Sequence, residues 1–326
     1  MHKTKFGLTL NNRGILYGAT TVPEMLELAE RADRDGWDGV WVGDSILAKP
    51  RLDAIVLLSA IAGRTKRVRL GAACMASTPL RNPLVLASQW ASLDRLSEGR
   101  TIFVPCQGEG GTGGGAFHRE FAAFGHDTRS RMRRMEEAIE IMRLTSTGTN
   151  VSYAGEFVSF EDVTIEPRPV QQPIPMWVTA NPSFERPRHV ESAYRRVAKY
   201  GDGWMTVVRT PDEFRQSLPM IRRYAEEEGR TLPDTFEVCL YYNINVNEDA
   251  QAAYDESKKV LDLYYDVSWS EAYHRAWTAL GSPAQCAAQL REYVDAGVTT
   301  LLLRPASFDC AAQYRRITEH VLPRLA

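Results

Sequence analysis

The sequence predicts an α/β fold, a (β/α)₈ TIM barrel that forms a single domain over residues 1–326, with long insertions at its C-terminal face. Three observations predict it. Short apolar segments alternate with amphipathic helical segments, there are eight apolar segments, and most are rich in Val, Ile and Leu without polar alternation. Such segments are typical of parallel strands buried on both faces. The expected strands are residues 5–10, 39–42, 67–73, 101–105, 176–180, 203–207, 236–246 and 299–303.

Helix starts are the clearest local signals between these strands. A capping box, in which a Ser or Thr and the residue three positions later bond each other's backbone amides, is expected at 21–24, 210–213 and 282–285. Gly36 and Gly297 are expected to follow helix ends. The alternative fold is a doubly wound open sheet, which would place a dinucleotide-binding glycine motif in the first βα turn. That turn reads Asn-Asn-Arg-Gly-Ile at 11–15 and contains no such motif.

Composition excludes several classes of protein. Lys and Arg number 39 and Asp and Glu number 41, so the net charge of 39 − 41 = −2 gives no basic surplus for nucleic acid. The longest apolar stretch, near 54–62, is too short to span a bilayer, and the first residues lack the features of a signal peptide. Five cysteines without a CxxC pair favour a cytoplasmic protein without disulfides. The six histidines form no metal-binding pattern, so no metal is expected.

Four connecting segments are longer than common barrel loops: 106–127, 146–172, 181–192 and 264–281. Long loops of this kind are usually lids or binding loops, and substrate specificity is expected to reside in 106–127, 146–172 and 264–281. Residues 150–166 are expected to form a hairpin with Ala-Gly at its turn.

Three side chains follow expected strands at the end where barrel active sites lie. Asp44 follows the second strand, and Cys106 and Glu109 follow the fourth, so all three are candidate catalytic residues. Each has a structural alternative. Asp44 could cap a turn, Cys106 could be a small buried hydrophobe, and Glu109 could be a solvated loop carboxylate.

Two charged or glycine-rich runs have open interpretations. Residues 108–113 formally match G-x-G-x-x-G, but their place after the fourth strand favours a flexible loop whose amides approach a phosphate or a planar ring. Four arginines crowd the start of the next helix, at 129, 131, 133 and 134. We expect them to pair with acids such as Glu136 and Glu137, with anion binding as the alternative.

Motifs along nearly the whole chain resemble those of the bacterial luciferase-like superfamily of flavin- and deazaflavin-dependent oxidoreductases. The resemblance rests on Asp-Gly-Trp-Asp-Gly-Val-Trp-Val-Gly-Asp at 35–44, Leu-Asp-Arg-Leu-Ser-Glu-Gly-Arg at 93–100, Gly-Asp-Gly-Trp at 201–204 and Gly-Ser-Pro at 281–283. It implies a dimeric (β/α)₈ barrel that holds FMN or coenzyme F420 across its C-terminal face. It also implies a non-prolyl cis peptide at 74–75. The cofactor-binding residues that it implies are Asp44, Ala73, Cys74, Met75, Gln107, Gly108, Glu109, Asn181 and Ser183.

The resemblance leaves the cofactor open. The Gly108-Glu109 pair matches the F420-dependent dehydrogenases, in which the Glu is an acid, but Ser45 stands where many members have His. We expect a monooxygenase that uses reduced FMN and O₂ on a small organic substrate. Because the chain has no NAD(P)H motif, a separate flavin reductase would supply the reduced flavin.

Apolar walls would protect the reacting flavin from water. The candidate wall residues are Met75, Trp41, Trp177 and Trp204. The alternative for each of them is a place in the barrel core. The alternatives are an F420-dependent oxidoreductase that transfers hydride, with Glu109 as proton donor, and a non-catalytic flavin-binding barrel. A homodimer is expected to form through the apolar helices at 53–62 and 84–96.

Overall fold

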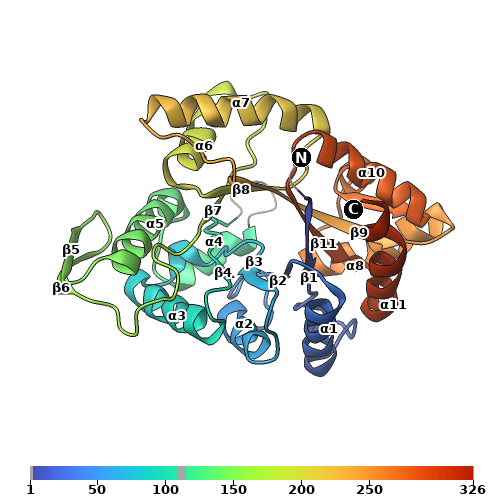
Figure 1. Ribbon diagram of the computed structural model, residues 1–326, viewed down its shortest axis with the longest axis horizontal. Helices are drawn as coiled ribbons and strands as arrows, with labels where there is room; N and C mark the ends of the chain where they lie inside the picture. Colours follow the sequence, from blue (N-terminus) through green and yellow to red (C-terminus); the bar gives the residue numbers. More distant parts are fainter. Residues whose placement is uncertain (1–2, 109–114, 326) are drawn as a thin grey trace.

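Parallel strands arranged in a ring form the centre of this computed structural model, which describes residues 3–108 and 115–325. Neighbouring strands follow the order β4-β3-β2-β1-β11-β9-β8-β7, and a bridge between Phe103 and Met176 closes the ring from β4 to β7. The predicted (β/α)₈ barrel is therefore confirmed (Figure 1). The barrel strands are β1 (Lys5–Thr9), β2 (Gly39–Val42), β3 (Arg69–Ala72), β4 (Thr101–Ile102), β7 (Trp177–Thr179), β8 (Gly203–Thr206), β9 (Glu237–Val246) and β11 (Thr300–Pro305).

Helices surround the barrel and alternate with its strands (Figure 1). Their sequence begins with α1 (Val22–Asp35), α2 (Ala54–Ala62), α3 (Pro83–Leu96), α4 (Gly115–Ala123), α5 (Arg131–Thr147) and α6 (Pro187–Tyr200). It continues with α7 (Pro211–Glu227), α8 (Ala250–Tyr265), α9 (Glu271–Ala276), α10 (Pro283–Asp295) and α11 (Cys310–Arg316).

The local signals in the sequence correspond to real element boundaries. All three capping boxes form, at the starts of α1, α7 and α10. Gly36 and Gly297 adopt positive φ of 88° and 103° directly after their helices, a conformation that favours glycine. The expected hairpin is present as β5 (Val151–Ala154) and β6 (Ser159–Val163).

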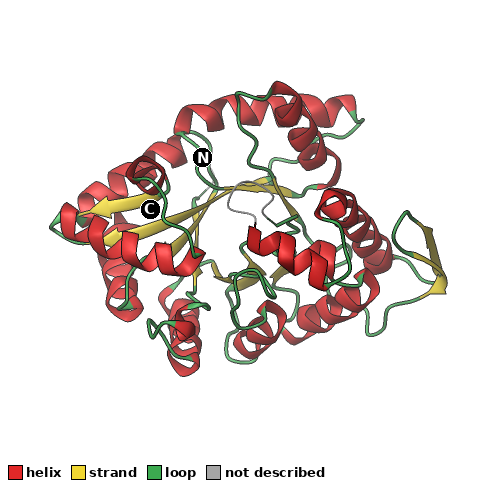
Figure 2. Cartoon of the chain, turned by 180° about the vertical axis from the view of Figure 1, so that it is seen from behind, coloured by secondary structure: helices red, strands yellow, loops and turns green. Residues whose placement is uncertain are grey.

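Two of the expected long loops contain elements that the sequence analysis missed. Helix α4 occupies part of 106–127, and it lies in front of the strands in Figure 2. The segment 264–281 contains α9 and a further strand, β10 (Thr278–Gly281). Strand β9 has ten residues and is longer than β8. It therefore pairs with β8 along its first half and with β10 along its second half.

Large side chains fill the barrel interior. Trp41 and Trp177 stack with ring centroids 5.0 Å apart, and a Cβ at Gly71 or Gly203 would overlap one of these rings. Below them Arg69 and Glu237 form an ion pair at the N-terminal end of the barrel. The three tryptophans suggested as cavity walls, Trp41, Trp177 and Trp204, are fully buried in this core.

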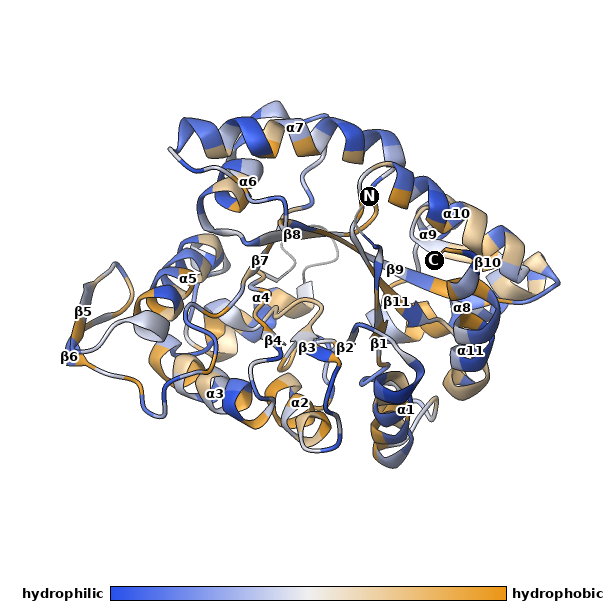
Figure 3. Ribbon diagram, viewed as in Figure 1, coloured by the Kyte–Doolittle hydropathy of each residue, from blue (hydrophilic) through white to orange (hydrophobic). Residues whose placement is uncertain are grey.

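The outer helices differ in the surface that they present to solvent. Helix α7 has a hydrophilic outer face, whereas α2 carries hydrophobic residues around much of its surface (Figure 3). Val56 on α2 and Val85 on α3 are 70% and 55% exposed. Among the described residues, no helix combines the length and apolar character that crossing a membrane requires.

The non-prolyl cis peptide lies between Ala73 and Cys74, so the expected position between Cys74 and Met75 was wrong by one residue. Met75 already belongs to the strand ladder, because its amide donates to the carbonyl of Val104 at 2.9 Å. The break in regular backbone therefore falls earlier, directly after β3.

Candidate active site

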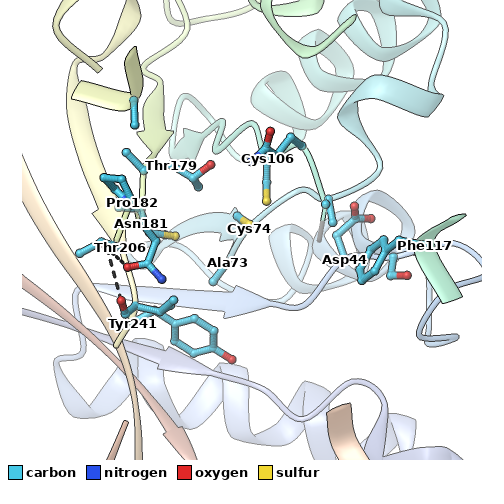
Figure 4. A pocket seen from close by; sticks show the side chains of 18 of the residues that line it. Asp44, Ala73, Cys74, Cys106, Phe117, Thr179, Asn181, Pro182, Thr206 and Tyr241 are labelled. Atoms are coloured by element: carbon cyan, nitrogen blue, oxygen red, sulfur yellow. Dashed lines mark hydrogen bonds between the residues drawn. The ribbon is translucent and has the colours of Figure 1, made fainter. Parts of the chain in front are cut away.

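A cavity of about 920 Å³ opens at the C-terminal ends of the barrel strands. That volume is at the upper end of the usual range for ligand pockets. Its walls come from segments that follow β2, β3, β4, β7 and β8, from β9 and β11, and from α4, α5, α6, α8 and α9. Figure 4 shows side chains from several of these segments around one space. The long loops and the strand ends therefore meet where barrel active sites are found.

Asp44 is a buried carboxyl group in the wall of this cavity. Its Oδ2 accepts a hydrogen bond of 2.7 Å from the amide of Ser77, and Oδ1 lies 3.7 Å from Nη2 of Arg81. Burial raises the pKa of Asp44, and the Arg81 charge and the Ser77 hydrogen bond only partly oppose this. A raised pKa makes the protonated form of a carboxyl group easier to populate, as a general acid requires.

Cys74 and Cys106 face each other from the ends of β3 and β4 (Figure 4). A hydrogen bond from the Cys74 thiol lowers the pKa of Cys106, and the same bond, with burial, raises the pKa of Cys74. Cys106 is thus the more acidic thiol in the cavity wall. Because thiolates are the reactive form, it is also the more reactive of the two.

Gln107 and Gly108 continue the wall after Cys106. Oε1 of Gln107 is buried and has no hydrogen-bond partner among the described residues, so it can accept from a bound molecule. Gly108 has a φ of 71°, and a Cβ there would crowd the ring of Phe117 on α4. Glu109, the next residue and a predicted catalytic group, lies outside the described residues.

One end of the cavity is basic and is built around the start of α6. We call it the α6 end, and it is lined by Arg131, Ser183, Arg186, His189 and Arg196. Asn181 lies beside it and accepts a hydrogen bond of 3.2 Å from Thr206 (Figure 4). Nε of Arg131 is buried and has no hydrogen-bond partner in the part of the chain that the structure describes, whereas Arg196 is paired with Glu136 at 2.6 Å.

Two of the four arginines around the start of α5 pair with acids, as expected, but with other acids than those that the sequence suggested. Arg129 pairs with Asp127 and Arg133 with Glu156, while Glu137 instead accepts from backbone amides of the β5–β6 hairpin. Arg131 faces the cavity, so it fits the anion-binding alternative. The fold brings Glu156 from the β5–β6 hairpin to Arg133, whereas Asp127 is close to Arg129 in the sequence as well.

The other end of the cavity is aromatic and also contains cations. We call it the aromatic end, and it is lined by Lys49, Arg51, Tyr241, Tyr264, Tyr265, Trp269, Tyr273, Trp277 and Arg304. Ring contacts connect its aromatic members, for example Tyr265 with Trp269 at 4.5 Å and with Trp277 at 5.3 Å. In the ring of strands, β11 lies opposite β4, with three strands between them on either side. The two ends therefore occupy opposite sides of the barrel mouth.

Most of the predicted cofactor-binding residues line this one cavity: Asp44, Ala73, Cys74, Gln107, Gly108, Asn181 and Ser183, together with Cys106. Met75 is fully buried and is not part of the cavity wall. The sequence analysis missed the aromatic end. Its signal was the density of Tyr and Trp in residues 264–277, inside a segment already expected to carry specificity. Among the described residues, no cluster of His, Cys, Asp and Glu is arranged to hold a metal.

The sequence profile described as luciferase-like monooxygenase matches residues 4–300. The chain is 26% identical to an F420-dependent glucose-6-phosphate dehydrogenase of Amycolatopsis mediterranei, over 93% of this chain and 94% of that protein. A protein of the same name from Kineococcus radiotolerans is also 26% identical, over 93% of each chain. Among solved structures, the monooxygenase RslO1 from Streptomyces bottropensis has a TM-score of 0.78 and 25% identity, over 99% of this chain and 100% of that one.

Proposed function

This chain belongs to the luciferase-like monooxygenase family of oxidoreductases, and within that family we propose that it is a coenzyme F420-dependent oxidoreductase. The observation that carries the proposal is the match, along 93% of the chain, to relatives named F420-dependent glucose-6-phosphate dehydrogenases. The sequence analysis expected FMN as the cofactor and F420 as the alternative, and this proposal exchanges the two. The proposed reaction is hydride transfer between the deazaflavin and an organic substrate.

The cavity has groups that fit such a cofactor. The unpartnered Oε1 of Gln107 can accept from a ring N–H, and Gly108 lets the backbone approach a flat ring. The α6 end supplies three arginine side chains and the positive end of a 14-residue helix for a phosphate-bearing tail. In this proposal Ala73, Cys74 and Cys106 form the wall beside the ring, and Asn181 and Ser183 lie beside the tail.

Bound F420 supplies the hydride chemistry, and this chain supplies positioning and proton transfer. Asp44 is the one carboxyl group among the described residues that line the cavity. Its Oδ2 is occupied by the Ser77 amide, so the proton would be held at Oδ1. We expect Asp44→Asn to lower turnover by roughly 10²–10⁴-fold, the usual value of general acid–base catalysis, with little change in F420 affinity.

Glu109→Gln is the matched comparison for Asp44→Asn, because both exchanges keep size and remove a titratable group. A large loss in the Glu109 variant with none in the Asp44 variant would move the proton-transfer role to Glu109.

Anaerobic titration with reduced F420 and reduced FMN tests the cofactor. We expect saturable binding of F420 that is tighter than that of FMN, followed by hydride transfer without consumption of O₂. Tighter binding of FMN, with O₂ uptake in the presence of a flavin reductase, would overturn the proposal. Binding of neither cofactor would overturn it in favour of the non-catalytic barrel.

The second candidate is a flavin-dependent monooxygenase, which is favoured by the likeness to RslO1 over the whole chain. The buried, apolar surroundings of the cavity wall near Cys74 and Phe117 are compatible with exclusion of water from a reduced flavin. The titration with the two cofactors separates this candidate from the first.

A further inference from the structure

Arg304 is a buried cation whose hydrogen-bonding capacity is mostly unused. It lies on β11, is 1% exposed, and lines the cavity at its aromatic end. Its Nη2 donates to the hydroxyl of Tyr265 at 2.7 Å, but Nε and Nη1 have no partner among the described residues. Buried donors are almost always satisfied in native proteins, so this arrangement calls for an acceptor that the protein itself does not supply.

Arg51 places a second cation beside Arg304. Its Nη1 donates to the hydroxyl of Tyr264 at 2.6 Å, and the Arg304 guanidinium lies 3.8 Å from the centre of the same ring. Position 43 is kept free for this contact, because a Cβ on Gly43 would overlap both Nη1 of Arg51 and the Tyr264 hydroxyl. The fold therefore holds two guanidinium groups together at some electrostatic cost.

Asp44 interacts with the Arg51 charge at a distance but does not form an ion pair with it. Neither Arg51 nor Arg304 forms an ion pair in the part of the chain that the structure describes. Asp44, the acid in the described cavity wall, is engaged with Ser77 and Arg81. A buried cation without a counter-charge is strongly destabilising, whereas an anion bound between the two arginines would offset the cost.

The walls around this cationic pair are aromatic and flat. Tyr241 and Tyr264 flank the Arg304 guanidinium, with ring centres 4.7 and 3.8 Å away, and Trp269 and Trp277 continue the lining. The Tyr241 hydroxyl is buried and also lacks a partner among the described residues. These rings meet at tilted or edge-on angles and present apolar surface to a planar body, and the guanidinium groups favour a planar carboxylate that accepts two parallel hydrogen bonds.

We propose that the aromatic end binds the substrate, and that this substrate is an aromatic carboxylate whose anionic group is held by Arg304 and Arg51. The inference rests on the proposed function, because the substrate must share the cavity with the cofactor. It goes further by naming a substrate class distinct from the sugar phosphate in the names of the relatives. The negative charge would face inward, on the side of the barrel mouth opposite the α6 end.

The test is binding, measured by calorimetry and by quenching of tryptophan fluorescence, with and without F420. The probes are 2-naphthoate, its neutral amide 2-naphthamide, and glucose 6-phosphate. We expect 2-naphthoate to bind most tightly. Arg304→Met should weaken its binding roughly 10- to 100-fold, the range for a lost charge-assisted hydrogen bond, while the amide is unaffected. Arg304→Lys should restore part of the affinity, because it restores charge without the planar fork.

The matched control is Arg230→Met, which removes a half-buried arginine that bonds the carbonyl of Gly201 away from the cavity. It should leave 2-naphthoate binding unchanged. If Arg304→Met fails to fold, Arg51→Met and Tyr241→Phe serve in its place, with expected losses in the same direction.

The outcomes separate this inference from the proposed function. Equal binding of naphthoate and its amide, or no effect of Arg304→Met, would overturn it and leave Arg304 as a structural cation–π residue. Arginine-dependent binding of glucose 6-phosphate but not of naphthoate would overturn it in favour of a sugar phosphate. Naphthoate binding that depends on Arg304 in a protein that does not bind F420 would support the inference while the proposed cofactor fails.

Discussion

The two ends of the cavity contain similar cationic groups in opposite surroundings. At the α6 end, Arg186 and His189 are exposed and Arg196 is paired with Glu136. At the aromatic end, Arg304 is buried, and two of its nitrogen atoms have no acceptor among residues 3–108 and 115–325. Water and salt can screen Arg186 and His189, so this first set suits a flexible, highly charged tail. The second set is shielded from water, so it selects for charge and shape together.

The largest expected effect concerns the α6 end. Combining Arg131→Ala with Arg186→Ala should weaken F420 binding by roughly tenfold for each arginine, the lower range for a lost bond to a charged group. Added salt should weaken binding to the wild-type protein as well. Binding of 2-naphthoate should not change. The measurement is fluorescence titration at two ionic strengths.

Arg133→Ala is the control for this pair, because Arg133 is a neighbouring exposed arginine that bonds Glu156 and does not line the cavity. Loss of both ligands in the double variant would mean that the two ends are not independent sites.

A smaller effect should follow from Gly43→Ala, which changes the aromatic end without removing a charge. The new Cβ would push Arg51 and Tyr264 apart, so 2-naphthoate affinity should fall roughly fivefold or more. Overpacking should also lower the free energy of unfolding by about 1–3 kcal/mol in denaturant titration. Gly63→Ala is the matched control, since a Cβ has room there. Unchanged naphthoate binding in Gly43→Ala would contradict the proposed geometry.

The next prediction concerns the relative reactivity of the two thiols in the cavity wall. Because its pKa is lowered, Cys106 should carry more thiolate at neutral pH than Cys74, whose pKa is raised. Iodoacetamide should therefore modify Cys106 several-fold faster, and its rate should begin to rise at a lower pH. Cys74→Ala should slow the reaction, because it removes the hydrogen bond that stabilises the thiolate. Peptide mass spectrometry measures this, and faster labelling of Cys74 would contradict it.

The smallest effect on either end is expected from the surface of α2 and α3. We propose that Val56 and Val85 lie in a homodimer contact, because both are apolar and largely exposed. Val56→Glu together with Val85→Glu should shift sedimentation toward a monomer, since burying the new charges is costly. Affinities for F420 and naphthoate should stay within about twofold, given that charge effects fade over this distance. A wild-type protein that sediments only as a monomer would rule out the contact.

The sequence alone determined the fold and the position of much of the site. Apolar runs without polar alternation identified eight parallel strands, and Ser and Thr caps located the starts of α1, α7 and α10. Asp44 and Cys106 were predicted as site residues because each follows an expected strand, and both line the cavity at that end of the barrel. These are local signals, because each depends on residues only a few positions apart.

Tertiary structure alone decided which distant side chains share the cavity and in what surroundings. Arg51, Tyr264 and Arg304 are separated by more than 200 residues at their extremes, so no local pattern could show that they touch. The tryptophans of the core could not be separated from cavity walls by composition, since both environments favour large rings. Whether a cation is satisfied depends on every group packed against it, and only the folded chain specifies those neighbours.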